Sequence, residues 1–491
     1  MPRNIRKACC AAFSLALGSG PSSVAAQIDD ADRAGAPAET REDRRYGKQL
    51  EAPPSPLLFR LPGTGQAAPP QRLTYQYSYS GEAEGTYRRN PDLDRRVLDN
   101  VSLVKPQVNG IIVYRPTDSL EATLEMVLER EIPIREPSSV TLPNGTIQFA
   151  PEKRRWSLLV DQGFVTFRRP GQPFSLSVGR RNFEDDRHWL YDTSMDMVSA
   201  GYREGRFRAE VSFGREIWTD LDLAPHVQQV KDRIDTYMLY ADYRGIENHR
   251  LGVYGIARDD RAKLEGRPVL AGVRLQGTPS ESLSYWGEFA AVRGKDEDSH
   301  RLKGHAFDVG GTYRLNSLPF KPNVTLGYAF GSGDGNPNDK TNTEFRQTGL
   351  QSNESRFAGV ALFNIYGEAI ETELSNLQVG TVGLGFRPDY ATSLDFVFHR
   401  YRLHKIADEN RSWALTALMN QVPGQQSKQV GQAFDIVLGF RNMFGVRRLG
   451  LDLRMGWFFP GKAFNRDEGT EEQPGIRRAN NAFALVAKFF Y

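Results

Sequence analysis

The chain has 491 residues, a formal net charge of +3 and a mean hydropathy of −0.51. No stretch approaches the roughly 20 consecutive apolar residues that a membrane-spanning helix needs, which excludes a helical membrane protein. The 63 basic and 60 acidic side chains nearly cancel, so the overall charge indicates no nucleic-acid partner.

The first 71 residues predict two segments that precede the folded domain. Residues 1–26 have the pattern of a secretory signal peptide, with a basic start, an apolar core at 8–17 and small residues before Gln27. The alternative is a buried N-terminal helix. Cys9 and Cys10 both lie in this segment, so the mature chain would hold no disulfide and no cysteine metal site. Residues 27–71 are rich in proline, alanine and charge, which predicts a disordered periplasmic extension.

From residue 72 the sequence alternates between apolar and polar residues. In segments 121–129, 207–213, 434–438 and 451–455, one face is apolar and the other is often charged. This period of two indicates β-strands, which a soluble sandwich could also contain. We predict eighteen strands, at residues 72–80, 98–114, 119–130, 155–168, 174–180, 194–203, 206–215, 233–243, 249–258, 267–276, 282–293, 304–314, 322–331, 375–386, 392–402, 433–440, 449–458 and 481–491.

The connections between these strands favour a membrane barrel over a sandwich. Connections from an odd-numbered to an even-numbered strand tend to be long, as at 131–154, 332–374 and 403–432. Connections from an even-numbered to an odd-numbered strand, such as 204–205, are short. This asymmetry is typical of outer-membrane barrels, with short turns in the periplasm and long loops outside. The predicted fold is all-β: an 18-stranded antiparallel transmembrane β-barrel over 72–491, with short periplasmic turns and long extracellular loops.

Aromatic residues support the same assignment. The last strand ends on Tyr491 and is similar to the C-terminal signature of bacterial outer-membrane proteins, although an ordinary edge strand is the alternative. Aromatic residues near predicted strand ends suit the two interfacial girdles of such barrels, and the alternative is that some fill the core or lie in loops. They are Trp156, Trp286, Trp457, Tyr313 and Tyr401.

Strand parity selects charged residues that face the lumen. Each of Arg208, Arg274, Arg454 and Lys488 has neighbours along its strand that are apolar and suited to face lipid. An arginine or lysine pointing into lipid at mid-depth costs about 2–4 kcal/mol, so these side chains are expected to point inward. They either select an anionic substrate or belong to a ladder of paired charges that only solvates and stiffens the barrel. An acidic strip at 121, 125 and 129 shares the inward face.

The long connection 332–374 predicts a plug or lid that folds into the lumen, because loops of this length are usually functional. The alternative is an exposed surface loop. Residues 412–420 could form a short helix. The glycine-rich run 331–336 lacks the strand-to-helix setting of a phosphate loop, and it lacks the sixth-position glycine and final glutamate of a calcium loop. No zinc-type spacing of histidines is present, so we expect no metal and no cofactor.

Three groups of motifs carry a family resemblance. They are residues 347–353 (QTGLQSN) with 373–378 (ELSNLQ), residues 177–186 (SVGRRNFEDD) with 191–193 and 220–225, and residues 453–460 (LRMGWFFP). The chain resembles the alginate export family of outer-membrane barrels. The resemblance implies an eighteen-stranded barrel that exports a polyanionic polysaccharide through an arginine-rich constriction. The matching motif positions are Arg180, Arg181, Asp186, Asp192, Asp222 and Arg454.

The chain also departs from the family pattern. Glu354 stands where the family motif has a basic residue, and Asp161 replaces another family arginine. The turn 441–448 is short, whereas the family's type example has a long periplasmic turn that acts as a gate.

The expected function is a channel in the Gram-negative outer membrane that exports alginate or a related polyuronate by passive diffusion through an arginine-lined lumen. Arginine suits this task because its planar fork pairs with carboxylates and stays charged. The alternatives are a porin for small anionic solutes and, less favoured, an outer-membrane enzyme, for which no motif is present. The expected partners are an anionic polysaccharide and membrane lipid, and the resemblance implies a periplasmic scaffold and a monomer.

Overall fold

The computed structural model describes residues 75–91, 93, 100–135, 140–141, 147–148, 155–217, 222–223, 234–260, 266–336, 338–406, 427–467, 476–477 and 480–491. The chain divides into two units, Met1–Gln71 and Arg72–Tyr491, and all described residues belong to the second. The predicted signal peptide, the periplasmic extension and the helix at 412–420 lie outside the described residues.

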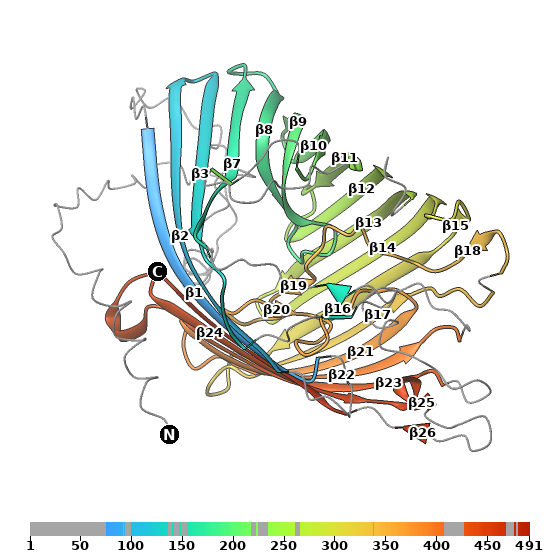
Figure 1. Ribbon diagram of the computed structural model, residues 1–491. Helices are drawn as coiled ribbons and strands as arrows, with labels where there is room; N and C mark the ends of the chain where they lie inside the picture. Colours follow the sequence, from blue (N-terminus) through green and yellow to red (C-terminus); the bar gives the residue numbers. More distant parts are fainter. Residues whose placement is uncertain are drawn as a thin grey trace. The chain divides into compact units, whose positions relative to one another are not determined.

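Eighteen antiparallel strands form a closed barrel (Figure 1). Each strand pairs with the next along the chain, and the last, β27, pairs with β1 from Glu82↔Phe490 to Arg89↔Phe483. The strands are β1 Tyr75–Arg89, β2 Asn100–Thr117, β3 Leu120–Glu129, β7 Ser157–Arg168, β8 Phe174–Glu184, β9 Asp192–Glu204, β10 Phe207–Arg215, β11 Ile234–Tyr243, β12 His249–Asp260, β13 Arg267–Ser280, β14 Leu283–Lys295, β16 His305–Arg314, β17 Asn323–Gly331, β21 Leu377–Phe386, β22 Thr392–Leu403, β23 Gln429–Phe440, β24 Gly450–Pro460 and β27 Ala482–Phe490.

Short elements add to the barrel. β4 (Ile132–Arg135) extends the sheet beside β2, and β15 (Arg301–Leu302) pairs with β18 (Thr341–Asn342). Three two-residue ladders lie apart from the main sheet: β5 (Val140–Thr141) with β6 (Ile147–Gln148), β19 (Glu354–Ser355) with β20 (Phe363–Asn364), and β25 (Arg466–Asp467) with β26 (Ile476–Arg477). Two 3-10 turns span Met443–Gly445 and Lys462–Phe464.

The eighteen predicted strands and the barrel they form are confirmed. The first strand differs most, because the sequence predicted 72–80 and β1 runs from Tyr75 to Arg89. Residues 81–89 contain few large apolar side chains, so the pattern did not mark them as a strand. Their backbone hydrogen bonds go to β2 on one side and β27 on the other, which makes them part of the closing seam.

The outer and inner faces of the barrel alternate along each strand. On β10, Val211 points outward with 56% of its surface exposed, whereas Ser212 points inward with 4% exposed. Unpaired strand edges cannot exist in lipid, and closure removes them. None of the helical turns in the described residues is long and apolar enough to cross a bilayer.

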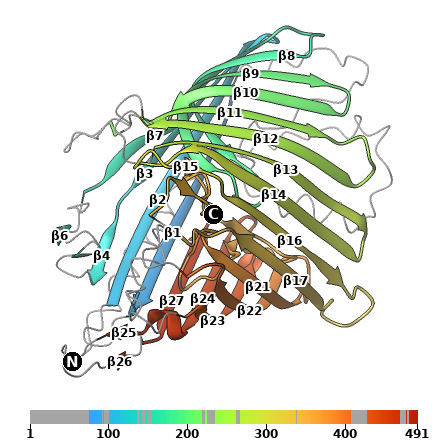
Figure 2. The same cartoon turned by 90° about the vertical axis from the view of Figure 1, so that its right-hand side faces the viewer.

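The two ends of the barrel differ in their connections (Figure 2). At the short-turn end the strands are joined by residues 118–119, 169–173, 205–206, 244–248, 281–282, 315–322, 387–391 and 441–449. The connections at the other end are longer on the whole, and we call it the long-loop end. By the usual rule for such barrels, the short-turn end faces the periplasm.

Two of the predicted girdle aromatics lie elsewhere. Tyr313 points outward and is 53% exposed, as a girdle residue should be. Trp286 and Tyr401 instead point into the barrel, where Trp286 donates to Asp308 and Tyr401 is 2% exposed. Trp286 has the same parity as the inward Glu288, so the strand pattern did indicate its face, whereas the arginines at 400 and 402 lie on the face opposite to Tyr401.

Candidate functional site in the barrel lumen

The connection 332–374, which we call the lumen loop, runs inside the barrel. Figure 1 places its two short strands, β19 and β20, within the ring of barrel strands. The loop leaves β17 at the long-loop end, and its tip reaches the short-turn end. There the Arg387 guanidinium donates to the Ala358 carbonyl at 2.5 Å, and the Val360 N–H donates to the Ser393 hydroxyl at 3.0 Å. The prediction that this connection folds into the lumen is therefore confirmed, and the alternative of an exposed surface loop is wrong.

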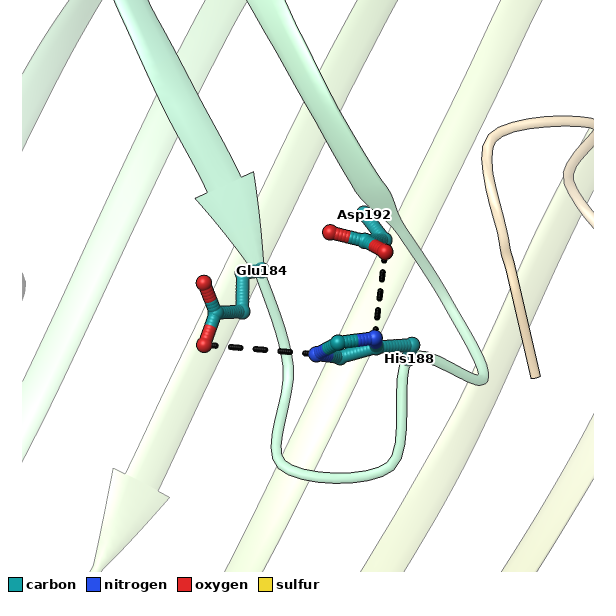
Figure 3. A group of neighbouring side chains, drawn as sticks. All are labelled: Glu184, His188 and Asp192. Carbon is teal, nitrogen blue, oxygen red and sulfur yellow. Dashed lines mark ion pairs between the residues drawn. The ribbon is translucent and has the colours of Figure 1, made fainter. Parts of the chain in front are cut away.

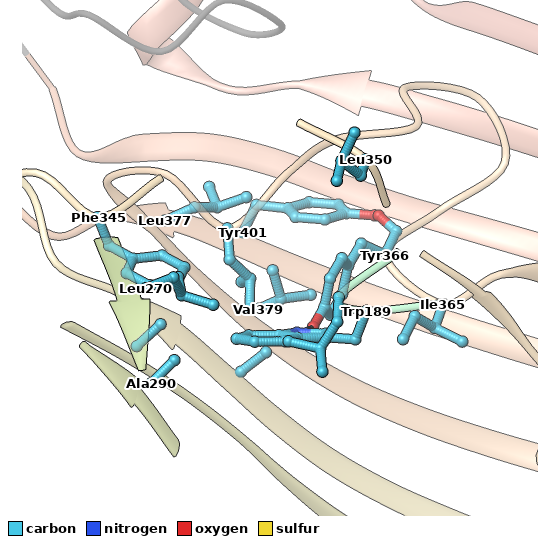
Figure 4. Close-up of a cluster of buried hydrophobic side chains, with 14 of the residues drawn as sticks. Trp189, Leu270, Ala290, Phe345, Leu350, Ile365, Tyr366, Leu377, Val379 and Tyr401 are labelled. Carbon is cyan, nitrogen blue, oxygen red and sulfur yellow. Dashed lines mark hydrogen bonds between the residues drawn. The ribbon is translucent and has the colours of Figure 1, made fainter. Parts of the chain in front are cut away.

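A buried apolar cluster holds the lumen loop to the wall (Figure 4). Trp189, from the connection 185–191, stacks on Phe345 with ring centroids 6.1 Å apart and donates to the Tyr366 hydroxyl at 2.9 Å. Trp189, Phe345, Leu350, Tyr366 and Leu374 are each at most 4% exposed. Burying one such side chain stabilises by ~1.5–3 kcal/mol, so the five together oppose release of the loop by roughly 10 kcal/mol. The lumen loop is a fixed part of the pore wall.

A polar network surrounds Asp308 beneath the loop. Its carboxylate accepts from Arg187 at 3.0 Å, from the Tyr366 hydroxyl at 2.9 Å and from the Trp286 indole at 2.8 Å. The Arg187 guanidinium also lies over the Trp286 ring, 4.2 Å from its centroid. Buried polar groups are stable only when their hydrogen bonds are satisfied. This network joins both the connection 185–191, through Arg187, and the lumen loop, through Tyr366, to Asp308 on the barrel wall.

Arg454 binds the lumen loop. Its guanidinium lies 2.6 Å from a Glu354 carboxylate oxygen and 3.6 Å from one of Glu368. Glu354, which we expected to depart from the family motif, is thus one of two acidic residues near Arg454. Burial raises the pKa of Glu368 to about 8; the nearby Asp435 adds to the effect, whereas Arg454 opposes it.

Arg274 forms a buried ion-pair centre. It is 1% exposed and pairs with Asp185 at 2.7 Å and with Glu288 at 2.5 Å. Burial raises the pKa of Asp185, but the charge of Arg274 and two backbone N–H donors outweigh burial and lower it. A side chain this deeply buried does not meet a passing solute in this structure.

The other sequence-predicted residues are dispersed. Arg180 lies across from Asp196, 3.4 Å away, and Arg181 pairs with Glu210. The Asp222 carboxylate accepts from the Leu158 N–H at 3.1 Å, and Lys488 pairs with Glu82 at 2.8 Å. Their role in selectivity stays a prediction.

Five arginines gather at the short-turn end of β7 and β9–β12. This arginine arc consists of Arg168, Arg203, Arg208, Arg244 and Arg250, each half-buried. Arg208 lies directly across from Arg203 on β9 and from Asp242 on β11.

Carboxylates also contact the arc. Asp242 lies 2.9 Å from Arg244 and 3.5 Å from Arg250, and Arg250 also pairs with Asp186. Arg168 pairs with Glu121 at 3.2 Å. These contacts place Asp242, Asp186 and Glu121 among the guanidinium groups of the arc.

Sequence reasoning found Arg208 and Asp186 here but missed Arg168, Arg203, Arg244 and Arg250. Parity could have found Arg244, because it continues the inward series of Tyr240 and Asp242. Arg187, Trp189 and Glu368 lie in connections without a period, so no local signal marked them.

His188, in the connection 185–191, lies between two acidic residues (Figure 3). The Asp192 carboxylate lies 3.1 Å from Nδ1, and that of Glu184 lies 4.0 Å from Nε2. One ligand atom from each of the three residues lies within 4.8 Å of the other two, a spacing that could hold a metal ion. The Ser352 hydroxyl also contacts Nδ1 at 3.1 Å and Asp192 at 2.8 Å. The group thus fastens the lumen loop to connection 185–191.

The charge on His188 follows from these neighbours. Burial lowers its pKa, but Asp192, Glu184 and Asp185 outweigh burial and raise the pKa above its ordinary value. The protonated imidazole is therefore favoured between the two carboxylates.

A closed eighteen-stranded barrel with an apolar outer face, a charged interior and an inserted loop defines a porin-type protein of the Gram-negative outer membrane. Solved porins of Pseudomonas aeruginosa share the fold. The structure of OpdK with vanillate has a TM-score of 0.52 at 12% identity and covers 84% of this chain and 98% of that one. OpdQ has a TM-score of 0.52 at 9% identity, with the same two shares. Identities this low show the fold alone.

The chain belongs to the alginate export family, whose profile matches residues 71–474. The alginate production protein AlgE of Pseudomonas aeruginosa is 28% identical over 310 residues, which cover 55% of this chain and 60% of that relative. AlgE of Azotobacter vinelandii is 27% identical over 154 residues, covering 28% of this chain and 32% of the relative. The matches thus span less than two thirds of either relative.

Proposed function

We propose that this barrel exports an anionic exopolysaccharide, alginate or a related polyuronate, from the periplasm. The arginine arc carries the proposal, because it places five positive groups on the inner face at the end that the polymer would enter. The family and its alginate production relatives support the same substrate class.

The chemistry of the arc suits transport. A guanidinium presents a planar fork that pairs with a carboxylate through two hydrogen bonds and remains charged at any physiological pH. Selective pores must bind their solute strongly enough to admit it and weakly enough to release it. Asp242, Asp186 and Glu121 temper the positive field and so prevent the polymer from being trapped.

The proposed transport is passive diffusion down the polymer's gradient and includes no catalytic step. The fixed lumen loop narrows the channel on the β14–β24 side, so the polymer passes along the wall that carries the arc. We propose that the barrel works as a monomer and receives the polymer from a periplasmic scaffold. The mass of the detergent-solubilised protein tests the first point, and co-purification with a periplasmic protein tests the second.

Planar-bilayer conductance tests the function. The wild-type channel should prefer anions and be blocked by oligouronates. The double variant Arg203→Glu/Arg208→Glu should lose the anion preference, and its half-blocking oligouronate concentration should rise about tenfold, equivalent to ~1.4 kcal/mol.

Arg206→Glu is the matched control, because Arg206 is exposed on the neighbouring turn and its Nη1 donates to the Gly245 carbonyl. It should change blocking little. Equal effects in the arc variant and the control would refute a specific role of the arc. Anion conductance without any block by oligouronates would instead favour a porin for small anionic solutes.

A further inference from the structure

Glu184, His188 and Asp192 come together between β8 and β9 (Figure 3). Glu184 is the last residue of β8 and Asp192 is the first of β9, and the two are direct partners in the ladder between these strands. The connection 185–191 brings His188 back to this pair. One donor atom from each residue lies within 4.8 Å of the other two. Within the described ranges, no other set of three histidine or acidic side chains meets this spacing.

A positive charge between the two carboxylates stabilises this arrangement. Like charges directly opposite each other on neighbouring strands destabilise a sheet. The imidazole of His188 lies between them, with Nδ1 3.1 Å from Asp192 and Nε2 4.0 Å from Glu184. A proton on the imidazole supplies one positive charge. A divalent ion bound in place of that proton supplies two, and it keeps the imidazole as a neutral ligand.

Backbone contacts hold His188 in place between the carboxylates. Its φ is 46°, in the left-handed region that residues other than glycine rarely adopt. A residue keeps such a conformation where the surroundings impose it, as they often do at ligand-binding sites. Here the His188 N–H donates to the Asp185 carbonyl at 2.9 Å, and its carbonyl accepts from the Asn353 N–H of the lumen loop at 2.9 Å. The imidazole is therefore positioned before any ion binds.

Ser352 of the lumen loop supplies the outer hydrogen bonds of such a site. Its hydroxyl donates to Asp192 at 2.8 Å and contacts Nδ1 of His188 at 3.1 Å. Residues that bind a metal are usually oriented by hydrogen bonds of this kind. On the other side of the imidazole, the Glu184 side chain is 40% exposed. An ion can therefore enter from the water beside Glu184, and water can complete its coordination.

We propose that Glu184, His188 and Asp192 bind a divalent transition-metal ion, and that Zn²⁺ fits the site best. One imidazole nitrogen with two carboxylate oxygens suits Zn²⁺, whereas Ca²⁺ and Mg²⁺ are bound by oxygen ligands. Zn²⁺ holds its ligands at about 2.0–2.2 Å, so the site closes by a turn of the partly exposed Glu184 side chain.

The bound ion strengthens the attachment of the lumen loop, because Ser352 hydrogen-bonds to Asp192. The sequence-based expectation of no metal rested on the lack of paired histidines, and this group contains a single histidine. The site stands independently of the proposed substrate.

Calorimetric titration with Zn²⁺ tests the site. The full chain carries Cys9→Ala/Cys10→Ala, which removes both thiols of the sequence, and is stripped of metal with a chelator in detergent. It should bind one Zn²⁺ per chain, and His188→Gln and Glu184→Gln should each abolish that binding. Ser352→Ala removes only an outer hydrogen bond, so it should weaken binding about tenfold. X-ray absorption at the zinc edge should show an imidazole ligand in the parent chain.

His300→Gln is the matched control. The Nδ1 atom of His300 also lies beside an aspartate, 3.4 Å from Asp296, but the described residues offer this pair no third ligand at the same spacing. This variant should bind Zn²⁺ as the parent chain does. An equal loss of binding in His300→Gln and His188→Gln would overturn the proposal.

Binding that survives in Glu184→Gln would also overturn it. The Glu184 side chain is partly exposed, so this variant should fold and decides the question even if His188→Gln does not. Ca²⁺ binding as tight as that of Zn²⁺, or a zinc-edge spectrum without imidazole, would exclude His188 as a ligand and overturn the site as proposed. None of these outcomes depends on whether oligouronates block the pore.

Discussion

At the scale of single residues, Arg274 shows how a lumen charge can be structural. Its two carboxylate partners, Asp185 and Glu288, are also buried, at 7% and 4% exposed. Removing one partner of a buried ionic group leaves an uncompensated charge, which typically costs about 3–5 kcal/mol. Arg274→Met should therefore lower the unfolding free energy of the barrel by about that amount, measured by urea unfolding in lipid vesicles.

Arg267 provides the control for this prediction. It pairs with Asp259 at 2.7 Å, but the two side chains are 68% and 39% exposed. Exposed ion pairs contribute about 0–1 kcal/mol, so Arg267→Met should unfold almost as the wild type does. Equal losses in the two variants would show that burial is not what gives Arg274 its importance.

Glu368 predicts how attachment of the lumen loop depends on pH. Its pKa is about 8 when the loop is docked, against an ordinary value of 4.5, so docking favours the protonated carboxyl. The groups that face it are Arg454 from β24, Asp435 from β23 and Glu354 from the loop itself. The free energy that Glu368 contributes to docking of the loop is fully present below pH 4.5, declines as the pH rises and is lost above about pH 8.

Hydrogen exchange of loop residues 360–370, corrected for intrinsic rates, measures this effect. Protection should fall between about pH 5 and about pH 9 in the wild type. Glu368→Gln stays neutral throughout, so its protection should be flat and, at high pH, greater than that of the wild type. The same slope in Glu368→Gln would assign the pH dependence to another group.

At the scale of elements, the lumen loop behaves as part of the core. Trp189 is 1% exposed and contacts the loop through both Phe345 and Tyr366. Truncating a buried tryptophan costs about 3–5 kcal/mol, so Trp189→Ala should loosen the loop. Proteolysis within 345–374 should become faster, and single-channel conductance should rise.

Trp156→Ala is the control for this element, because Trp156 is 45% exposed just before β7. It should leave both the proteolysis rate and the conductance close to those of the wild type. A Trp189→Ala channel with unchanged conductance would mean that the loop does not narrow the pathway.

At the scale of the whole molecule, the seam between β1 and β27 closes the barrel. Ala83 and Phe489 are direct partners across it, whereas Leu485 pairs with Tyr87. Partners on adjacent strands lie about 4.5–5.5 Å apart, within reach of a disulfide. In a chain without its two native cysteines, Ala83→Cys/Phe489→Cys should form a disulfide on oxidation, detected as a mobility shift on a denaturing gel without reductant.

The offset pair Ala83→Cys/Leu485→Cys tests the register. Four residues along a strand span about 13 Å, too far for a disulfide without backbone movement. Cross-linking of both pairs would indicate a slipping seam, and cross-linking of neither would indicate an open one.

The sequence by itself determined the eighteen strands and the inward face of Arg208, Arg274, Arg454 and Lys488. Both follow from a period of two and from turn residues, which are properties of adjacent positions. Only the tertiary structure decided which of these arginines are buried, how the lumen loop runs and where the arginine arc gathers. These depend on contacts such as that between Trp189 and Tyr366, 177 residues apart in the chain. Burial is set by the close approach of distant segments, and no local pattern records that approach.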